Sequence, residues 1–141
     1  MIKDGDVLTV FGREWKVTSV EVGGAPEFLD RRVRDIIKRE FQKTVREIMR
    51  ELPRDMRPPK ICVRDTTSRW GSCSSTGTIS LSYRLSFAPL EILRYVVIHE
   101  CCHLKEMNHS PRFWMLVREY FGSYDAPRRW LGKHGQSLFK L

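Results

Sequence analysis

A helical segment that contains ionisable side chains constrains this chain more than any other feature. A helix with an apolar face is predicted from Pro89 to about Glu106, because apolar residues recur there at three- and four-residue steps. The residues of that face are Ile92, Leu93, Val96, Val97 and Leu104. His99, Glu100 and His103 fall within the same stretch. Burial of two histidines and a glutamate without a ligand is costly, so we expect the helix to hold a functional site.

The spacing of the two histidines predicts a metal site. Residues four apart lie on one face of a helix, so the imidazoles of His99 and His103 can reach one ion. Glu100 follows the first histidine and projects beside the metal, where it can accept a proton from a bound water. This H-E-x-x-H arrangement is typical of zinc hydrolases, in which Zn²⁺ lowers the pKa of its water toward about 7. A pair of hydrogen-bonded structural histidines is the alternative.

A catalytic zinc needs a third protein ligand and one open position. His109 is the predicted third ligand, provided that a short turn after the helix returns it to the metal. Metzincin proteases share the six-residue step from His103 to His109, but they have glycine where this chain has Glu106. The side chain of Glu106 is the rival ligand. His134 is alone near the C-terminus, and we expect it at the surface.

The remaining periodicities predict an α+β fold. The predicted elements are two short strands in 7–22, a long amphipathic helix over 28–51, strands over 61–64 and 79–85, a Ser110-capped helix ending at Gly122, and a short helix from Asp125 through Trp130. A small mixed or antiparallel sheet is expected to pack on the metal-binding helix and on the long N-terminal helix. Residues 1–141 are predicted to form a single domain, in which 1–25 are a short N-terminal β-hairpin.

The composition limits which cellular compartment and which binding partners we expect. The 141 residues carry a net charge of +8, which favours nucleic acid, nucleotides or acidic proteins as partners. The alternative is an Arg-rich surface that is only exposed to water. No apolar run is long enough to span a membrane. The N-terminus does not resemble a signal peptide, so we expect a cytoplasmic protein whose four cysteines are free. The oligomeric state is not predicted.

Three segments resemble the YgjP-like metallopeptidase family, which is related to the SprT and WLM domains. They are Arg69–Ser74, the strand end Tyr83–Leu85, and the stretch V-V-I-H-E-C-C-H-L-K-E-M-N-H-S-P-R-F-W from Val96 to Trp114. The resemblance implies a zincin-like fold over roughly residues 60–135, with His99, His103 and His109 as zinc ligands and Glu100 as the base. The longer β-rich N-terminal region of the family is shortened here to about twenty residues before the long helix.

Further residues are candidates to bind the substrate. The candidate set is Arg69, Trp70, Gly71, Ser72, Tyr83 and Arg84. In zincin-like folds a strand edge near the metal binds an extended peptide, although Ser72, Ser74 and Ser75 could instead surround a phosphate. A purely structural turn is the third interpretation. Tyr83, Arg84 and Tyr120 are also candidates to stabilise an oxyanion, and the thiol of Cys73 could reach the zinc.

Three functions are compatible with these residues. A zinc metallopeptidase acting on peptide or protein substrates fits the motif and the family resemblance. The same resemblance also implies a UTP pyrophosphatase, but the chain has no Gly-rich phosphate loop. A DNA-associated zinc-binding module is the third function, and the intact Glu100 with only three evident ligands argues against it.

Overall fold

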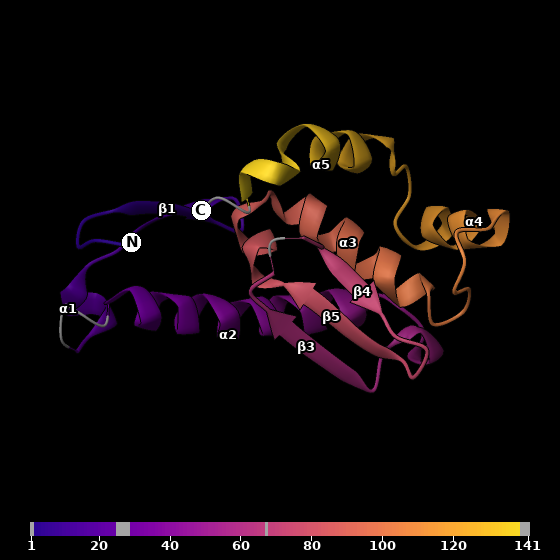
Figure 1. Cartoon of the computed structure of the whole chain (residues 1–141), viewed down its shortest axis with the longest axis horizontal. Helices are drawn as coiled ribbons and strands as arrows, with labels where there is room; N and C mark the ends of the chain where they lie inside the picture. Colours follow the sequence, from indigo (N-terminus) through magenta and orange to yellow (C-terminus); the bar gives the residue numbers. More distant parts are fainter. Residues whose placement is uncertain (1, 25–28, 67, 139–141) are drawn as a thin grey trace.

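The chain folds as an α+β structure in which a small mixed sheet packs against helices (Figure 1). The computed structural model describes residues 2–24, 29–66 and 68–138. Its elements are β1 (Val7–Val10), β2 (Arg13–Lys16), α1 (Ser19–Val22), α2 (Leu29–Met49), the 3₁₀ helix η2 (Arg54–Met56), β3 (Lys60–Arg64), β4 (Gly71–Cys73), β5 (Thr78–Ser82), the 3₁₀ helix η3 (Tyr83–Phe87), α3 (Leu90–Cys102), α4 (Pro111–Tyr120) and α5 (Asp125–Leu138). The predicted fold class is confirmed.

The larger sheet is mixed and has the strand order β3-β5-β4. β3 runs parallel to β5, with Ile61 opposite Ile79. β4 runs antiparallel to β5, with Ser72 opposite Ser80. This order puts β4 at an edge of the sheet, where it lies next to α3 (Figure 1).

Helices α2 and α3 pack together against β5 and form the main core with it. The apolar positions predicted for the long helix are all buried: Leu29, Val33, Ile37, Phe41, Val45 and Ile48. Ile79 and Leu81 of β5 join Phe41 and Val45 in one cluster with the apolar side chains of α3. Residue 28, where the sequence predicts the helix to begin, lies outside the described residues.

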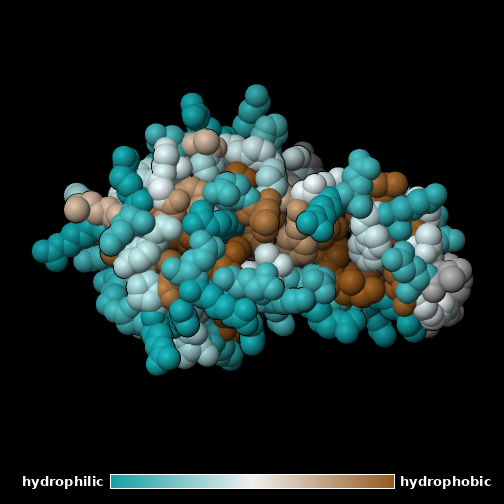
Figure 2. All heavy atoms as spheres, turned by 180° about the vertical axis from the view of Figure 1, so that it is seen from behind, coloured by the Kyte–Doolittle hydropathy of each residue, from teal (hydrophilic) through white to brown (hydrophobic). Residues whose placement is uncertain are grey.

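The N-terminal hairpin packs over a second cluster at one end of α2. β1 and β2 pair through a two-residue turn at Phe11 and Gly12, whose φ angles are +52° and +78°, as a type I′ turn requires. The backbone N–H of Phe11 donates to the carbonyl of Ser86 across 2.8 Å, which ties the hairpin to η3. Seen from behind, hydrophobic atoms show through a mostly hydrophilic surface in the middle and at the hairpin end (Figure 2).

Four predicted boundaries are wrong. Residues 19–22 form helix α1 instead of continuing the second strand. β5 ends at Ser82 and not at residue 85, because the Ser82 hydroxyl accepts a hydrogen bond from the Arg84 N–H and starts η3. α3 ends at Cys102 rather than near residue 106. α5 continues to Leu138 rather than ending at Trp130.

The residues around Gly71 also form a strand that the sequence did not predict. The stretch from Thr66 to Thr78 is rich in serine, threonine and glycine, which favours turns. Pairing with β5 nevertheless draws Gly71–Cys73 into the sheet as β4. The local composition is therefore overruled by a tertiary contact.

All four cysteines are free thiols, and Cys101 and Cys102 are buried in the main core. Within the described ranges, no helix has the length and apolarity that crossing a membrane requires.

Candidate metal centre

Three histidines converge at the end of α3. His99 lies in the last turns of the helix, His103 is the first residue after it, and His109 precedes α4. One ring nitrogen from each of them lies within 4.8 Å of the other two. Among the described residues, this is the group of histidine, cysteine or carboxylate side chains that is close enough to hold an ion, and it does not include Glu106 or His134.

The chain turns tightly between the second and third histidines. Hydrogen bonds from the backbone N–H groups of residues 103–106 to the carbonyls of residues 100–102 tighten the end of α3. Nδ1 of His103 lies 2.9 Å from the carbonyl oxygen of Glu106. A carbonyl only accepts, so Nδ1 carries the proton and Nε2 keeps its lone pair. Among the described residues other than glycine, only Phe11 has a positive φ. No residue between His103 and His109 therefore has the left-handed conformation that favours glycine, and this turn forms without the glycine of the metzincins.

Helix α4 supports the histidines with two aromatic rings. Ser110 caps this helix, since its hydroxyl oxygen accepts a hydrogen bond from the Phe113 N–H at 3.3 Å. The ring of Phe113 stacks on His103 with a centroid distance of 4.3 Å. The indole of Trp114 stacks on His109 at 5.9 Å. Both rings therefore contact candidate metal ligands, although the sequence singled out neither residue as part of the site.

Glu100 is held between α3 and β4. The residue is 7% exposed, and its Oε2 lies 3.2 Å from Nδ1 of His99. A Cβ atom at Gly71 would lie 3.0 Å from Cγ of Glu100 and 3.2 Å from the carbonyl oxygen of Ser80. Glycine at position 71 therefore lets the strand approach the carboxylate, which explains part of the R-W-G-S segment in structural terms.

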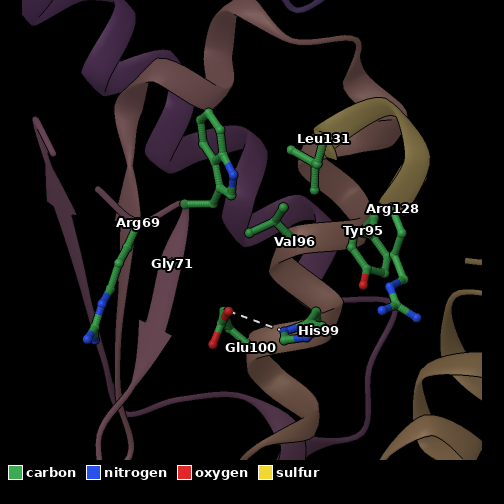
Figure 3. A pocket seen from close by; sticks show the side chains of 9 residues that line it. Arg69, Gly71, Tyr95, Val96, His99, Glu100, Arg128 and Leu131 are labelled. Atoms are coloured by element: carbon green, nitrogen blue, oxygen red, sulfur yellow. Dashed lines mark hydrogen bonds and ion pairs between the residues drawn. The ribbon is translucent and has the colours of Figure 1, made fainter. Parts of the chain in front are cut away.

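A pocket of about 410 Å³ opens beside His99 and Glu100 (Figure 3). It is lined by Arg69, Trp70, Gly71, Tyr95, Val96, His99, Glu100, Arg128 and Leu131. Three of the predicted substrate residues, Arg69, Trp70 and Gly71, thus lie at the candidate site. Ser72 does not line this pocket and instead lines a smaller neighbouring hollow on the sheet.

Tyr83 and Arg84 have structural roles in this fold. Tyr83 is 3% exposed and belongs to the cluster under the N-terminal hairpin. Arg84 is 7% exposed, and its Nε lies 2.8 Å from a carboxylate oxygen of Asp65. Neither side chain lines the pocket beside Glu100. Tyr120 lines a different pocket, together with Met56.

The serines after β4 close a turn. The hydroxyl of Ser74 accepts a hydrogen bond from the Thr78 N–H at 3.0 Å and lies 2.9 Å from the hydroxyl of Thr76. This arrangement supports the structural interpretation of the serine-rich stretch. The thiol of Cys73 does not belong to the histidine group, and its pKa is raised by burial and by the charge of Glu100.

Tyr95 and Arg128 are polar pocket residues that sequence reasoning missed, and Leu131 is an apolar one. Tyr95 precedes His99 by four residues on α3, so helical periodicity was a signal for it. Burial raises its pKa to about 12, while the positive charge of Arg128 acts in the opposite direction. Arg128 comes from α5, and no spacing in the sequence connects it with the motif on α3.

The donor set fits a catalytic zinc ion. Three imidazoles with one open position are a known ligand set for Zn²⁺, and bond lengths of about 2.0–2.1 Å put tetrahedral ligand nitrogens roughly 3.4 Å apart. His109 is exposed, so a small side-chain rotation can bring its nitrogen closer. The pKa of His109 is lowered by desolvation and by the neighbouring His103 and His99, which favours the neutral form that binds a metal.

Comparisons with known proteins bear on the fold and the family of the chain. A solved structure, the crystal structure of the metallopeptidase zymogen of Pyrococcus abyssi abylysin, superposes with a TM-score of 0.51. Its sequence is 24% identical, and the match covers 66% of this chain and 93% of that chain. No curated protein matches the chain. The structural likeness shows a shared fold.

The fold is thus the zincin-like fold of metallopeptidases, and it carries a histidine triad that could bind a metal. Residues 9–134 match the family model described as YgjP-like, metallopeptidase domain. The chain belongs to the YgjP-like family, as the sequence motifs indicated.

Proposed function

We propose that this chain is a zinc-dependent metallopeptidase, with His99, His103 and His109 as metal ligands and Glu100 as the catalytic base. The observation that carries the proposal is the meeting of three imidazole nitrogens within 4.8 Å, one of which belongs to His99, which lines the same pocket as Glu100. Membership of a metallopeptidase family supports the same reaction.

The metal would supply Lewis acidity and lower the pKa of a bound water toward about 7. We infer that Glu100 accepts a proton from the attacking water, and the burial of its carboxylate beside His99 at the pocket wall supports this role. The water oxygen bonds to the peptide carbonyl carbon. Glu100 then passes the proton to the amide nitrogen as the C–N bond breaks, so that one residue serves as base and as acid.

Strand β4 offers a binding edge for an extended peptide. It is an edge strand of the sheet, and Arg69, Trp70 and Gly71 at its start line the pocket that contains Glu100. An extended peptide can pair with such an edge through backbone hydrogen bonds. We therefore expect peptide or unfolded protein substrates to lie between β4 and the three histidines.

The test compares zinc-loaded wild-type protein with Glu100→Gln on casein, with mass spectrometry of the products. We expect hydrolysis to fall by about 10²–10⁴-fold in Glu100→Gln, the usual contribution of a general base, while one zinc per chain is retained. Glu91→Gln is the matched control, since Glu91 is an exposed residue on the same helix and its loss should leave hydrolysis unchanged.

Two further arms test the alternatives from the sequence. UTP is offered to the same preparations, and release of pyrophosphate without any peptide cleavage would replace the peptidase proposal with a nucleotide hydrolase. Duplex DNA is offered at several salt concentrations. Binding that weakens steeply with salt, in a protein without hydrolase activity, would favour the DNA-associated zinc module.

A further inference from the structure

The pocket beside Glu100 has two chemically different parts. Its apolar walls are formed by Trp70, Val96 and Leu131. Tyr95 and Arg128 form the part nearest α5, on the side of His99 that faces away from Glu100 (Figure 3). A group bound in the pocket can therefore contact both an apolar surface and two hydrogen-bond donors.

The ring of Tyr95 is buried, and its hydroxyl faces the pocket. The residue is 4% exposed, and its ring packs edge-on against His99 at 5.7 Å and Phe121 at 5.3 Å. Its hydroxyl makes no hydrogen bond with any of the described residues, and in Figure 3 its oxygen lies on the side of Arg128. Because none of the described residues has a buried side-chain oxygen or nitrogen without a partner, this hydroxyl is open to the pocket that Tyr95 lines, where it can donate to a ligand.

Arg128 is an exposed residue of α5 whose guanidinium lies over an aromatic ring. Its Cζ lies 4.8 Å from the centre of the Trp114 ring, and that indole packs against His99 at 5.8 Å and against His109 at 5.9 Å. Within the described part of the chain, the guanidinium makes no ion pair. A guanidinium stacked on an aromatic ring keeps its N–H edges available for a planar anion.

We propose that Tyr95 and Arg128 bind a carboxylate of the substrate, either the side chain of an acidic residue next to the cleaved bond or the C-terminus of the peptide. The inference rests on the proposed peptidase function and names its substrate class. The guanidinium makes a charge-assisted, bidentate contact with the carboxylate, and the phenol adds a third donor. Trp70, Val96 and Leu131 hold the aliphatic part of the same residue.

The net charge of the chain also favours acidic substrates. A net charge of +8 attracts acidic peptides and increases their rate of encounter. Glu100 is the only acidic one among the described residues that line the pocket, and His99 separates it from the donor pair (Figure 3). The carboxylate therefore binds apart from the group that transfers the proton.

The experiment uses zinc-loaded protein and matched peptides. Cleavage sites in casein are mapped first, and the best site is copied into peptides that differ only by Glu or Gln beside the cleaved bond, each with a free or an amidated C-terminus. We expect kcat/KM to be at least tenfold higher for the peptide with the recognised carboxylate. The Glu and Gln pair reports a side-chain carboxylate, whereas the free and amidated pair reports the C-terminus.

Variants assign the preference to the donor pair. In Arg128→Gln, kcat/KM for the matched peptides should differ by less than about twofold, mainly through a change in KM. In Tyr95→Phe the preference should fall severalfold. Arg128→Lys should keep part of it. Arg129→Gln, which removes an exposed charge from the same helix, is the control and should retain the full preference. Thermal unfolding of each variant shows that the fold is intact.

A binding measurement separates this inference from the proposed function. Isothermal titration of zinc-loaded Glu100→Gln with the same peptides should show tighter binding of the carboxylate form, and the Arg128→Gln change should abolish the difference. If no peptide is cleaved but this difference persists, the anion site stands and the peptidase function is wrong. Equal affinities, or equal loss of kcat on both peptides in Arg128→Gln, would overturn the carboxylate site, and the second result would assign Arg128 to oxyanion stabilisation.

Discussion

Nδ1 of His103 lies 2.9 Å from the backbone carbonyl oxygen of Glu106. The contact fixes the orientation of a candidate metal ligand with a main-chain atom, in a turn that also leads toward His109. Because the acceptor belongs to the backbone, it does not depend on the side chain at position 106. Among the described residues, the group that could hold an ion includes His109 and not the side chain of Glu106.

We predict that Glu106→Ala keeps zinc binding within about threefold of wild type, whereas His109→Ala weakens it by more than about 100-fold. Loss of an outer partner typically costs 10–100-fold in metal affinity, and loss of a ligand costs more. Competition with a chromophoric chelator measures both values. His134→Ala is the control, since His134 lies on α5 against Trp130 and outside the histidine group.

The close approach of Gly71 to Glu100 leads to a second prediction. Gly71→Ala puts a methyl group 3.0 Å from Cγ of Glu100, so either the carboxylate or strand β4 must move. We expect kcat/KM to fall by about ten- to 100-fold, as small misplacements of catalytic groups do, with zinc affinity unchanged. Steady-state kinetics on a cleaved peptide and a zinc titration measure the two quantities.

Gly132→Ala is the matched control for this substitution. Gly132 lies in α5, and a Cβ there meets no atom within 4 Å. An alanine in a helix should stabilise the protein slightly and leave activity unchanged. If Gly71→Ala were as active as Gly132→Ala, the strand would not constrain the carboxylate.

Much of the fold could be predicted because its periodic elements are long. The apolar stripe of α2 predicted its buried face, and a serine followed by proline predicted the start of α4. β4 was missed because three residues of turn-like composition become a strand only by pairing with β5. The length of α5 was missed because its glycines disfavour a helix. At Gly135, however, the absent side chain lets the helix pack on Trp70, where a Cβ would lie 2.7 Å from the indole.

Some residues of the candidate site could likewise be predicted from the sequence, and others could not. His99, Glu100 and His103 share one helix, so their spacing alone predicts that they share a face. The approach of His109 depends on a turn whose key contact is made by a backbone carbonyl, and no residue type encodes that contact. Arg128 reaches the pocket only through the packing of α5, which local sequence patterns do not report.

The cysteines allow a test of the core. Cys101 and Cys102 are fully buried; burial raises the pKa of Cys102 to about 12 and also raises the pKa of Cys101. A buried thiol with a raised pKa has little reactive thiolate. We predict that Ellman's reagent at pH 8 labels Cys62 in the folded protein, labels Cys73 more slowly because its pKa is also raised, and labels all four thiols in denaturant. Rapid labelling of more than two thiols in native protein would contradict the core described here.

The Ser110 cap of α4, the helix that follows His109, should contribute to the free energy of unfolding. Ser110→Ala removes the hydroxyl that accepts from the Phe113 N–H and should cost about 1 kcal/mol in the free energy of unfolding. Urea denaturation measures this cost. Ser110→Asp should restore stability, because aspartate is an equally good cap. If alanine and aspartate were equally destabilising, the cap would not explain the effect.

The lowered pKa of His109 predicts how acid affects the metal-free protein. Desolvation and the nearby His103 and His99 hold its pKa below the ordinary value of 6.5, so the unfolded chain binds the proton more readily than the folded chain. This contribution to stability is present above about pH 6.5 and is lost as the pH falls below it. Urea midpoints from pH 7.5 to 5.0 should therefore decline more steeply for wild type than for His109→Gln, with His134→Gln following wild type. Parallel curves for wild type and His109→Gln would show that His109 titrates normally and does not lie in the desolvated cluster.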